Sequence, residues 1–214
     1  MAVESKDPKT VIDAIRQIAI NCIVSPTGLD VDTLPMVDLE YLFLNLRAKS
    51  KGELLDAKFS CKAIVPKDDD PEAVCGNIIT LAVRVDELKV RIPEGYADVI
   101  PITEKIGVKM RLPRYKDASR IMSSSTTEVS PARQAYGMIL SSIESVYDDD
   151  QIYPVTSENI GELETFIESL TAEQFAKIEA FLESTPAIDY TFDVKCSKCG
   201  YDHHIAYKDI ASFF

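Results

Sequence analysis

The stretch IDYTFDVKCSKCGYDHHIAYK, residues 188–208, places two runs of alternating residues on either side of a CSKCG turn. Alternation of apolar and polar residues is typical of strands with one buried face, so this stretch predicts a β-hairpin. The turn holds Cys196 and Cys199 at C-x-x-C spacing, and Gly200 behind them can adopt the positive φ of a tight turn. Two sulfurs at this spacing converge on one ion, so the hairpin is predicted to carry half of a metal site.

A second pair of cysteines, Cys61 and Cys75, lies far upstream. Their spacing is much longer than in C-x-x-C, but Cys61 ends one predicted strand and Cys75 begins the next. If the acidic segment PKDDDPEA (66–73) folds out as a hairpin loop, the two sulfurs come together. Zinc takes four tetrahedral ligands and favours thiolates. The sequence therefore predicts one structural Zn²⁺ held by Cys61, Cys75, Cys196 and Cys199.

The fifth cysteine and the two histidines have other interpretations. Cys22 falls on the apolar stripe of a predicted helix and is interpreted as a small packed hydrophobe. His203 and His204 follow each other on a strand, which predicts one packed and one exposed ring. Imidazole also binds zinc, so either histidine stays open as a substitute ligand. A redox C-x-x-C of the thioredoxin type opens a helix beside a βαβ unit, whereas strands flank this one.

Hydrophobic periodicity divides the chain into four predicted segments. Residues 1–52 form N-terminal helices, 53–113 a β-region with the first cysteine pair, 114–185 a helical segment, and 186–214 a zinc-knuckle hairpin that packs on the β-region. The predicted fold class is α+β, with an antiparallel β-region that carries a zinc-ribbon-like site of four cysteines and a mainly helical segment.

Capping residues predict where individual helices begin and end. Asp38 is the N-cap candidate of the second helix, which ends before Gly52. A later helix is capped by Ser130 and is predicted to run to about Tyr147. Another begins at Thr171 with a capping box.

Composition and charge narrow the classes of function. With 214 residues and 46% hydrophobic content the chain can bury a core. Its net charge of −12 opposes a phosphate backbone, so no nucleic-acid partner is expected. No apolar run approaches the roughly 18 residues of a membrane span, and the N-terminal MAVESKDPK is polar where a signal peptide is apolar. A cytosolic protein is therefore expected.

No enzyme is predicted, because the common catalytic motifs are missing. The sequence has no P-loop, G-x-G-x-x-G, H-E-x-x-H or G-x-S-x-G pattern. The aspartate runs at 68–70 and 148–150 lack the spaced ligands of a calcium loop and are interpreted as solvated turns. We therefore expect no catalytic residue, and no cofactor other than zinc.

Several segments taken together resemble a known family. They are LEYLFLNLRAKSKGE (39–53), FSC (59–61), VCGN (74–77), ITEKIGVKMRLP (102–113), FDVKCSKCG (192–200) and SFF (212–214). In this order and spacing they are similar to the baseplate hub proteins, also described as hub assembly proteins, of T-even type myophages. The resemblance covers most of residues 30–214.

The resemblance implies a viral protein made in the cytoplasm of the bacterial host, where it helps to form the central hub of the tail baseplate. Family members are described both as virion components and as assembly factors. Other hub or tail proteins are the expected partners, no catalytic residue is implied, and the oligomeric state stays open.

Two other functions stay open on the sequence alone. The four cysteines also fit a zinc-ribbon accessory protein of transcription or replication, which the net charge disfavours. A hub-associated hydrolase would use Asp and Glu for acid-base chemistry, and the sequence pairs no carboxylates for this purpose.

The C-terminal residues are unusually apolar. Ile210, Phe213 and Phe214 are bulky at an end that is ordinarily polar. Two interpretations fit them, namely docking on the chain's own β-region and contact with a hub partner.

Overall fold

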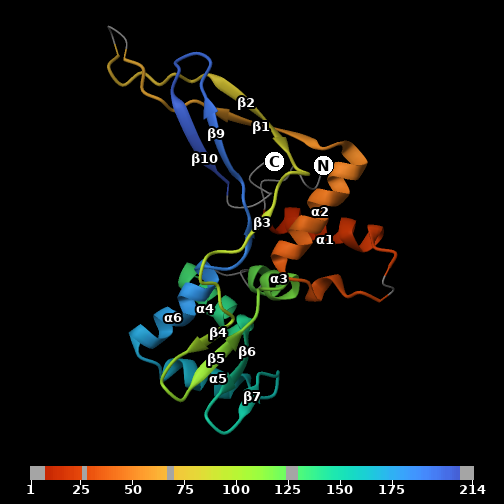
Figure 1. Ribbon diagram of the computed structural model, residues 1–214, viewed down its shortest axis with the longest axis vertical. Helices are drawn as coiled ribbons and strands as arrows, with labels where there is room; N and C mark the ends of the chain where they lie inside the picture. Colours follow the sequence, from red (N-terminus) through yellow and green to blue (C-terminus); the bar gives the residue numbers. More distant parts are fainter. Residues whose placement is uncertain (1–7, 26–27, 67–69, 124–129, 208–214) are drawn as a thin grey trace. The chain divides into compact units, whose positions relative to one another are not determined.

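We describe a computed structural model of the chain, which places residues 8–25, 28–66, 70–123 and 130–207 (Figure 1). Ile210, Phe213 and Phe214 lie outside these described residues, as do the first two aspartates of the 68–70 run. The chain forms two compact units. The first comprises Met1–Val24, Glu40–Val90 and Ile188–Phe214, and the second comprises Ser25–Leu39 and Arg91–Ala187. The division into four segments stays a prediction.

Helix α1, Pro8–Cys22, belongs to the first unit. It buries Val11, Ile15 and Ala19, which recur every four residues and therefore share one helical face. The interpretation of Cys22 as a packed hydrophobe is wrong, because its side chain is exposed. The buried stripe ends one turn earlier, at Ala19, so Cys22 belongs to the exposed C-terminal end of the helix.

Helix α2, Met36–Lys51, begins two residues before the predicted cap Asp38. The Met36 amide donates to the Pro113 carbonyl, and the Leu39 amide donates to Pro35. These bonds start the helix early, and Asp38 lies in the first turn, where its charge is favourable at the positive end of the helix dipole. Gly52 follows the helix with φ +99°, which confirms the predicted glycine stop.

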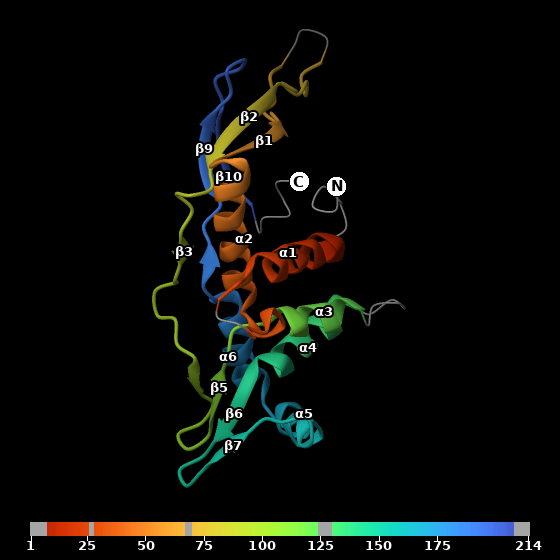
Figure 2. The same cartoon turned by 90° about the vertical axis from the view of Figure 1, so that its right-hand side faces the viewer.

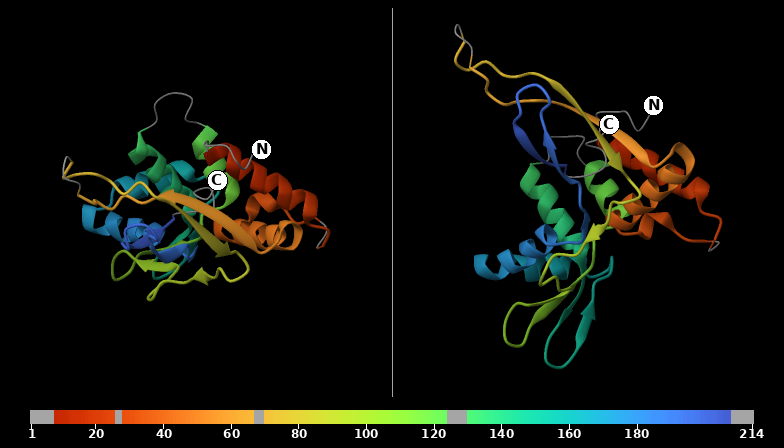
Figure 3. Two further views of the ribbon diagram at one scale, coloured as in Figure 1. Left: turned by 90° about the horizontal axis from the view of Figure 1, so that it is seen from above. Right: turned by 45° about the horizontal axis from the view of Figure 1, so that its top comes forward.

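The β-structure of the first unit consists of two antiparallel hairpins (Figure 2). Strands β1 (Leu54–Ser60) and β2 (Ile78–Arg84) pair from Leu54↔Arg84 to Ser60↔Ile78. Beyond this register the chain extends as a long finger, closed by a bridge between Ile64 and Val74 (Figure 3). Strands β9 (Thr191–Lys195) and β10 (Asp202–Ala206) form the second hairpin, as the alternation predicted.

The second unit combines a four-stranded antiparallel sheet with helices. The sheet order is β4 (Val99–Pro101), β5 (Gly107–Met110), β6 (Ile143–Tyr147) and β7 (Ile152–Pro154). The helices are the short 3-10 helix η1 (Val31–Thr33), α3 (Tyr115–Ser123), α4 (Pro131–Ser142), α5 (Ile160–Glu168) and α6 (Ala172–Glu183). The chain passes between the units at four points: after Val24, within α2 after Leu39, within the short strand β3 (Val90–Arg91) and within the short strand β8 (Ala187–Ile188).

One apolar core lies between this sheet and its helices. Its fully buried members are Ile102, Val108, Met110, Ile139, Leu140, Ile143, Leu163, Ile167, Ile178 and Phe181. The mixture of helices and antiparallel sheets confirms the α+β class. Among the described residues, no helix is both long and apolar enough to cross a membrane.

The predicted end of helix α4 is wrong. The helix stops at Ser142 instead of about Tyr147, and Ile143 is already extended, with φ −83° and ψ 121°. Ile143 pairs with Met110 and Val146 with Val108, so this apolar run forms strand β6. β-branched side chains fit a half-buried sheet, and pairing with β5 overrides the helical spacing.

The predicted starts of helices α4 and α6 agree with the structure. Ser130 Oγ accepts a hydrogen bond from the Arg133 amide, as an N-cap does. Thr171 and Gln174 form both bonds of the predicted capping box, since each side chain accepts from the other residue's amide.

A pair of isoleucines that differ in burial tests this core. Ile178 is 0% exposed and Ile152 is 69% exposed. We expect Ile178→Ala to lower the free energy of unfolding by about 2–5 kcal/mol, because it leaves a cavity among packed side chains. Ile152→Ala should change it by less than about 1 kcal/mol. Urea unfolding followed by circular dichroism measures both, and similar losses for the two variants would contradict this core.

Candidate metal centre

The first cysteine pair lies at the base of the β1–β2 finger, where backbone hydrogen bonds fix its position. The Cys61 amide donates to the Asn77 carbonyl at 2.8 Å, and the Gly76 amide donates back to Cys61 at 3.0 Å. The Cys75 amide donates to Ala63 at 2.9 Å. Gly76 has φ +64°, a conformation that glycine adopts without strain. The long loop between the cysteines therefore does not separate them.

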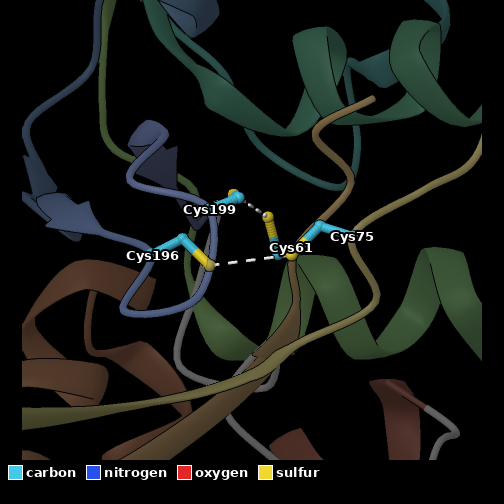
Figure 4. Close-up of side chains that lie close together, drawn as sticks. All are labelled: Cys61, Cys75, Cys196 and Cys199. Atoms are coloured by element: carbon cyan, nitrogen blue, oxygen red, sulfur yellow. Dashed lines mark hydrogen bonds between the residues drawn. The ribbon is translucent and has the colours of Figure 1, made fainter. Parts of the chain in front are cut away.

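The second pair occupies the turn between β9 and β10. The Cys196 amide donates to the Tyr201 carbonyl at 2.8 Å, and the Gly200 amide donates to Cys196 at 2.9 Å. Gly200 has φ +76°, as the tight turn requires. This turn directs the side chains of Cys196 and Cys199 toward the first pair (Figure 4).

The four sulfurs form one compact cluster. All lie within 4.8 Å of one another. The Cys61 and Cys199 sulfurs are 3.6 Å apart, and those of Cys75 and Cys196 are 3.9 Å apart (Figure 4). A regular tetrahedron with Zn–S bonds of about 2.3 Å has edges of about 3.8 Å. The two pairs therefore meet, and their spacing fits a tetrahedral thiolate site.

The cluster is largely removed from solvent. Cys61 is 0% exposed, Cys196 1% and Cys75 9%, while Cys199 is half-buried. Phe59, Ala63, Ile79 and Val194 pack around the sulfurs as a small apolar shell. Such a shell limits the access of water and of competing ligands to a bound ion.

Amide donors surround the sulfurs and oppose the effect of burial. Hydrogen bonds to the Cys196 sulfur, the largest of them from the Cys199 amide, lower the pKa of this thiol to about 6. Burial raises the pKa of Cys61 to about 12, although the Ala63 amide donates to its sulfur. Four adjacent thiols cannot all ionise in such a site without a cation. A divalent metal would supply the compensating charge as it displaces the protons.

Two side chains other than cysteine, those of His203 and Asn77, contact the sulfurs. His203 Nε2 lies 3.1 Å from the Cys61 sulfur. Its ring contacts the rings of Phe59 and Tyr201, with centroid distances of 5.5 and 4.8 Å. Asn77 Nδ2 is 3.6 Å from the Cys196 sulfur. With four sulfurs in place, these groups are suited to donate hydrogen bonds to bound thiolates.

His204 lies on the opposite face of β10, where it is exposed and contacts Asp193 at 2.8 Å. The alternation thus yields one partly packed and one exposed histidine, as predicted. No sequence pattern selects Asn77, whose contact depends on the way the two hairpins meet. Its position two residues after Cys75 is the one available signal.

The acidic run at 148–150 contains no comparable cluster. Asp148 accepts hydrogen bonds from the amides of Asp150 and Gln151, which lower the pKa of its carboxyl group. These bonds are those of a local turn, in agreement with the sequence interpretation. A metal ion needs several Cys, His, Asp or Glu side chains close together. Among the residues that the structure describes, the four cysteines form such a group.

Comparison with models of known protein families identifies the family of this chain. The family model described as T4 bacteriophage base plate protein matches residues 1–214, which is the whole chain. The chain belongs to this family. The match confirms the resemblance to T-even baseplate proteins, and membership in the base plate family points to a structural role in the phage tail. No curated protein and no solved structure matched the sequence.

Cysteine substitutions in this base plate protein test the metal site. We expect one zinc ion per chain, and its loss in Cys196→Ser and Cys199→Ser, since removal of one of four ligands eliminates much of the binding energy. Cys22→Ser is the matched control, because Cys22 is exposed and outside the cluster. Elemental analysis of protein purified without chelator provides the measurement. Absence of zinc from the wild-type protein would refute the site.

A histidine pair tests the outer contacts of the same site. His203→Ala removes the group next to the Cys61 sulfur, so we expect the zinc affinity to fall about tenfold to a hundredfold, as for other residues that support metal ligands. His204→Ala should leave the affinity unchanged, because its contact is with Asp193. Competition with a chromogenic chelator measures both. An equal effect of the two substitutions would argue against a role of His203 at the site.

Proposed function

We propose that the protein is a non-catalytic structural or assembly subunit of the baseplate hub of a contractile-tailed bacteriophage. It acts through protein-protein contacts and is stabilised by a structural Zn²⁺ ion. The observation that carries this proposal is the match of the base plate family over the whole chain. The resemblance of its segments to hub proteins supports the hub as the location within the baseplate.

The geometry of the sulfur cluster supports a structural metal. Catalytic zinc sites keep one coordination position for water or substrate, whereas structural sites complete a tetrahedron with protein ligands. Here four thiol groups supply all four positions, and three of the cysteines are buried. We assign zinc as the ion because tetrahedral thiolate sets favour it among the common divalent metals.

The small size of the core around the sulfurs indicates the role of the ion. The buried residues around the sulfurs are Cys61, Ala63, Cys75, Ile79 and Cys196, so the cysteines make up most of this small core. Small structural cores gain stability from metals when apolar burial is insufficient. Zinc binding would therefore contribute directly to the folding of the first unit.

Neither alternative function receives support from the structure. The base plate family and the net charge of −12 both argue against an accessory protein of transcription or replication. A hydrolase needs carboxylates that are positioned for acid-base work. Among the described residues the buried acidic side chain is Asp117, which forms an ion pair with Arg111 at 2.7 Å and accepts from the Arg114 amide. These contacts suit a packing role.

The proposed site of action is the host cytoplasm during tail assembly, with partners among other hub and tail proteins. Family membership agrees with a place in the virion tail. Mass spectrometry of purified virions distinguishes a retained subunit from an assembly factor that leaves.

The function is tested by complementation of a phage that lacks this gene. We expect no functional baseplates without the protein and recovery of plaques with the wild-type gene. His204→Ala should complement fully, because its side chain is exposed and contacts Asp193. Cys199→Ser should fail, because the first unit would lose its metal. Co-purification of tagged protein with hub proteins from the complemented infection completes the test. Normal baseplates in the absence of the gene would overturn the proposal.

A further inference from the structure

A groove runs between helix α1 and the C-terminal half of α2 within the first unit. Its volume is about 450 Å³, which is in the size range of binding pockets. The lining residues are Ile18, Cys22, Phe43, Leu46, Arg47, Lys49, Ser50 and Lys51. The sulfur cluster contributes nothing to this surface.

The floor of the groove is apolar and incompletely covered. Helix α1 turns Val11, Ile15 and Ala19 into the core, which leaves Ile18 half-buried and Cys22 exposed beside it. Apolar side chains that remain open in a concave surface are typical of contact sites for other molecules.

The rim of the groove is basic. Arg47, Lys49 and Lys51 line it, and none of the described residues in the lining is acidic. The basic lining differs from the chain as a whole, which is acidic, with 35 acidic and 23 basic residues. The Arg47 guanidinium donates to the carbonyls of Gly52 and Leu54 and is held in place, whereas Lys49 and Lys51 are exposed. A partner of opposite sign is therefore favoured.

The length of the groove suits a helix. From Phe43 to Lys51 helix α2 rises about 12 Å, which corresponds to about two helical turns. An amphipathic helix presents apolar side chains at i, i+3, i+4 and i+7 over the same distance. Helices that lie in grooves bind through such anchors.

We propose that this groove binds an acidic amphipathic helix of another tail protein. Its apolar side chains would cover Ile18 and Leu46, and its Asp and Glu side chains would face Lys49 and Lys51. The inference rests on the proposed function, since it names the kind of partner through which a hub subunit would act.

A synthetic peptide tests the chemistry of the groove. The probe is a labelled helical peptide of about 16 residues, with leucines at i, i+3, i+4 and i+7 and glutamates beside them. The first comparison peptide has lysine in place of every glutamate, and the second has the leucines scrambled. Anisotropy with the full-length, zinc-loaded protein should show at least about tenfold tighter binding of the probe than of either comparison peptide. Equal binding of the three peptides would overturn the proposal.

Charge reversal in the protein locates the binding. Lys49→Glu with Lys51→Glu should weaken binding of the glutamate peptide about tenfold or more, with zinc content and circular dichroism unchanged because both side chains are exposed. The matched control is Lys58→Glu with Lys116→Glu, which changes the net charge equally at exposed positions outside the groove. An equal loss in both double variants would overturn the groove as the site.

Two further results would also count against the proposal. Sedimentation that shows dimers of the wild-type protein, abolished by the Lys49 and Lys51 substitutions, would assign the groove to a second copy of the chain. Hub proteins that co-purify equally with the wild-type and the charge-reversed protein would exclude the groove as the interface, while the proposed function would stand. If no hub protein co-purifies with either form, the proposed function itself fails, whatever the peptide binds.

Discussion

The convergence of four sulfurs from two separate hairpins is the constraint on which the first unit depends. Cys75 and Cys196 are 121 positions apart, and their sulfurs are 3.9 Å apart. The intervening chain contains the whole Arg91–Ala187 part of the second unit. After it, the chain must return to the first unit and bring Cys196 next to Cys75. Closing such a long loop costs conformational entropy that grows slowly with its length. A two-stranded hairpin is only marginally stable on its own, so the cluster is the point at which both hairpins gain a common core.

The meeting of the four cysteines could be predicted because its signals are local. The C-x-x-C spacing followed by Gly200 defines a turn, and the strands on each side of Cys61 and Cys75 imply a hairpin that brings them together.

The predictions that were wrong concern residues whose structure is decided by tertiary contacts. Ile143 and Val146 fit a helical stripe, yet pairing with β5 makes them a strand. Cys22 fits the stripe of α1 by spacing, but the packed face ends at Ala19. The contacts of His203 and Asn77 with sulfur depend on how the hairpins meet, which no local pattern encodes.

Groups around the sulfur cluster can compensate the negative charge of the thiolates. A Zn²⁺ ion held by four thiolates would leave a net charge of about −2 in a buried place, which is costly unless hydrogen-bond donors face the sulfurs. The amides of Ala63 and Cys199 and the side chain of Asn77 supply such donors. Lys198 adds a cation close by, and its ammonium donates to the Cys75 carbonyl at 3.3 Å. Such donors would lower the cost of burying the charge of a bound metal.

The same strand that ends at the metal site begins at the basic groove. Arg47 lines the groove and donates to the carbonyls of Gly52 and Leu54, which ties the end of α2 to the start of β1. Seven residues later β1 delivers Cys61 to the sulfur cluster. Because β1 is paired along its full length with β2, a shift at Cys61 would be transmitted through the register to Leu54 and Arg84. A structural ion at one end of β1 would in this way help to hold Arg47, the groove cation that is bonded to the other end. By this link, a buried metal with no open coordination position would affect the contact surface proposed above.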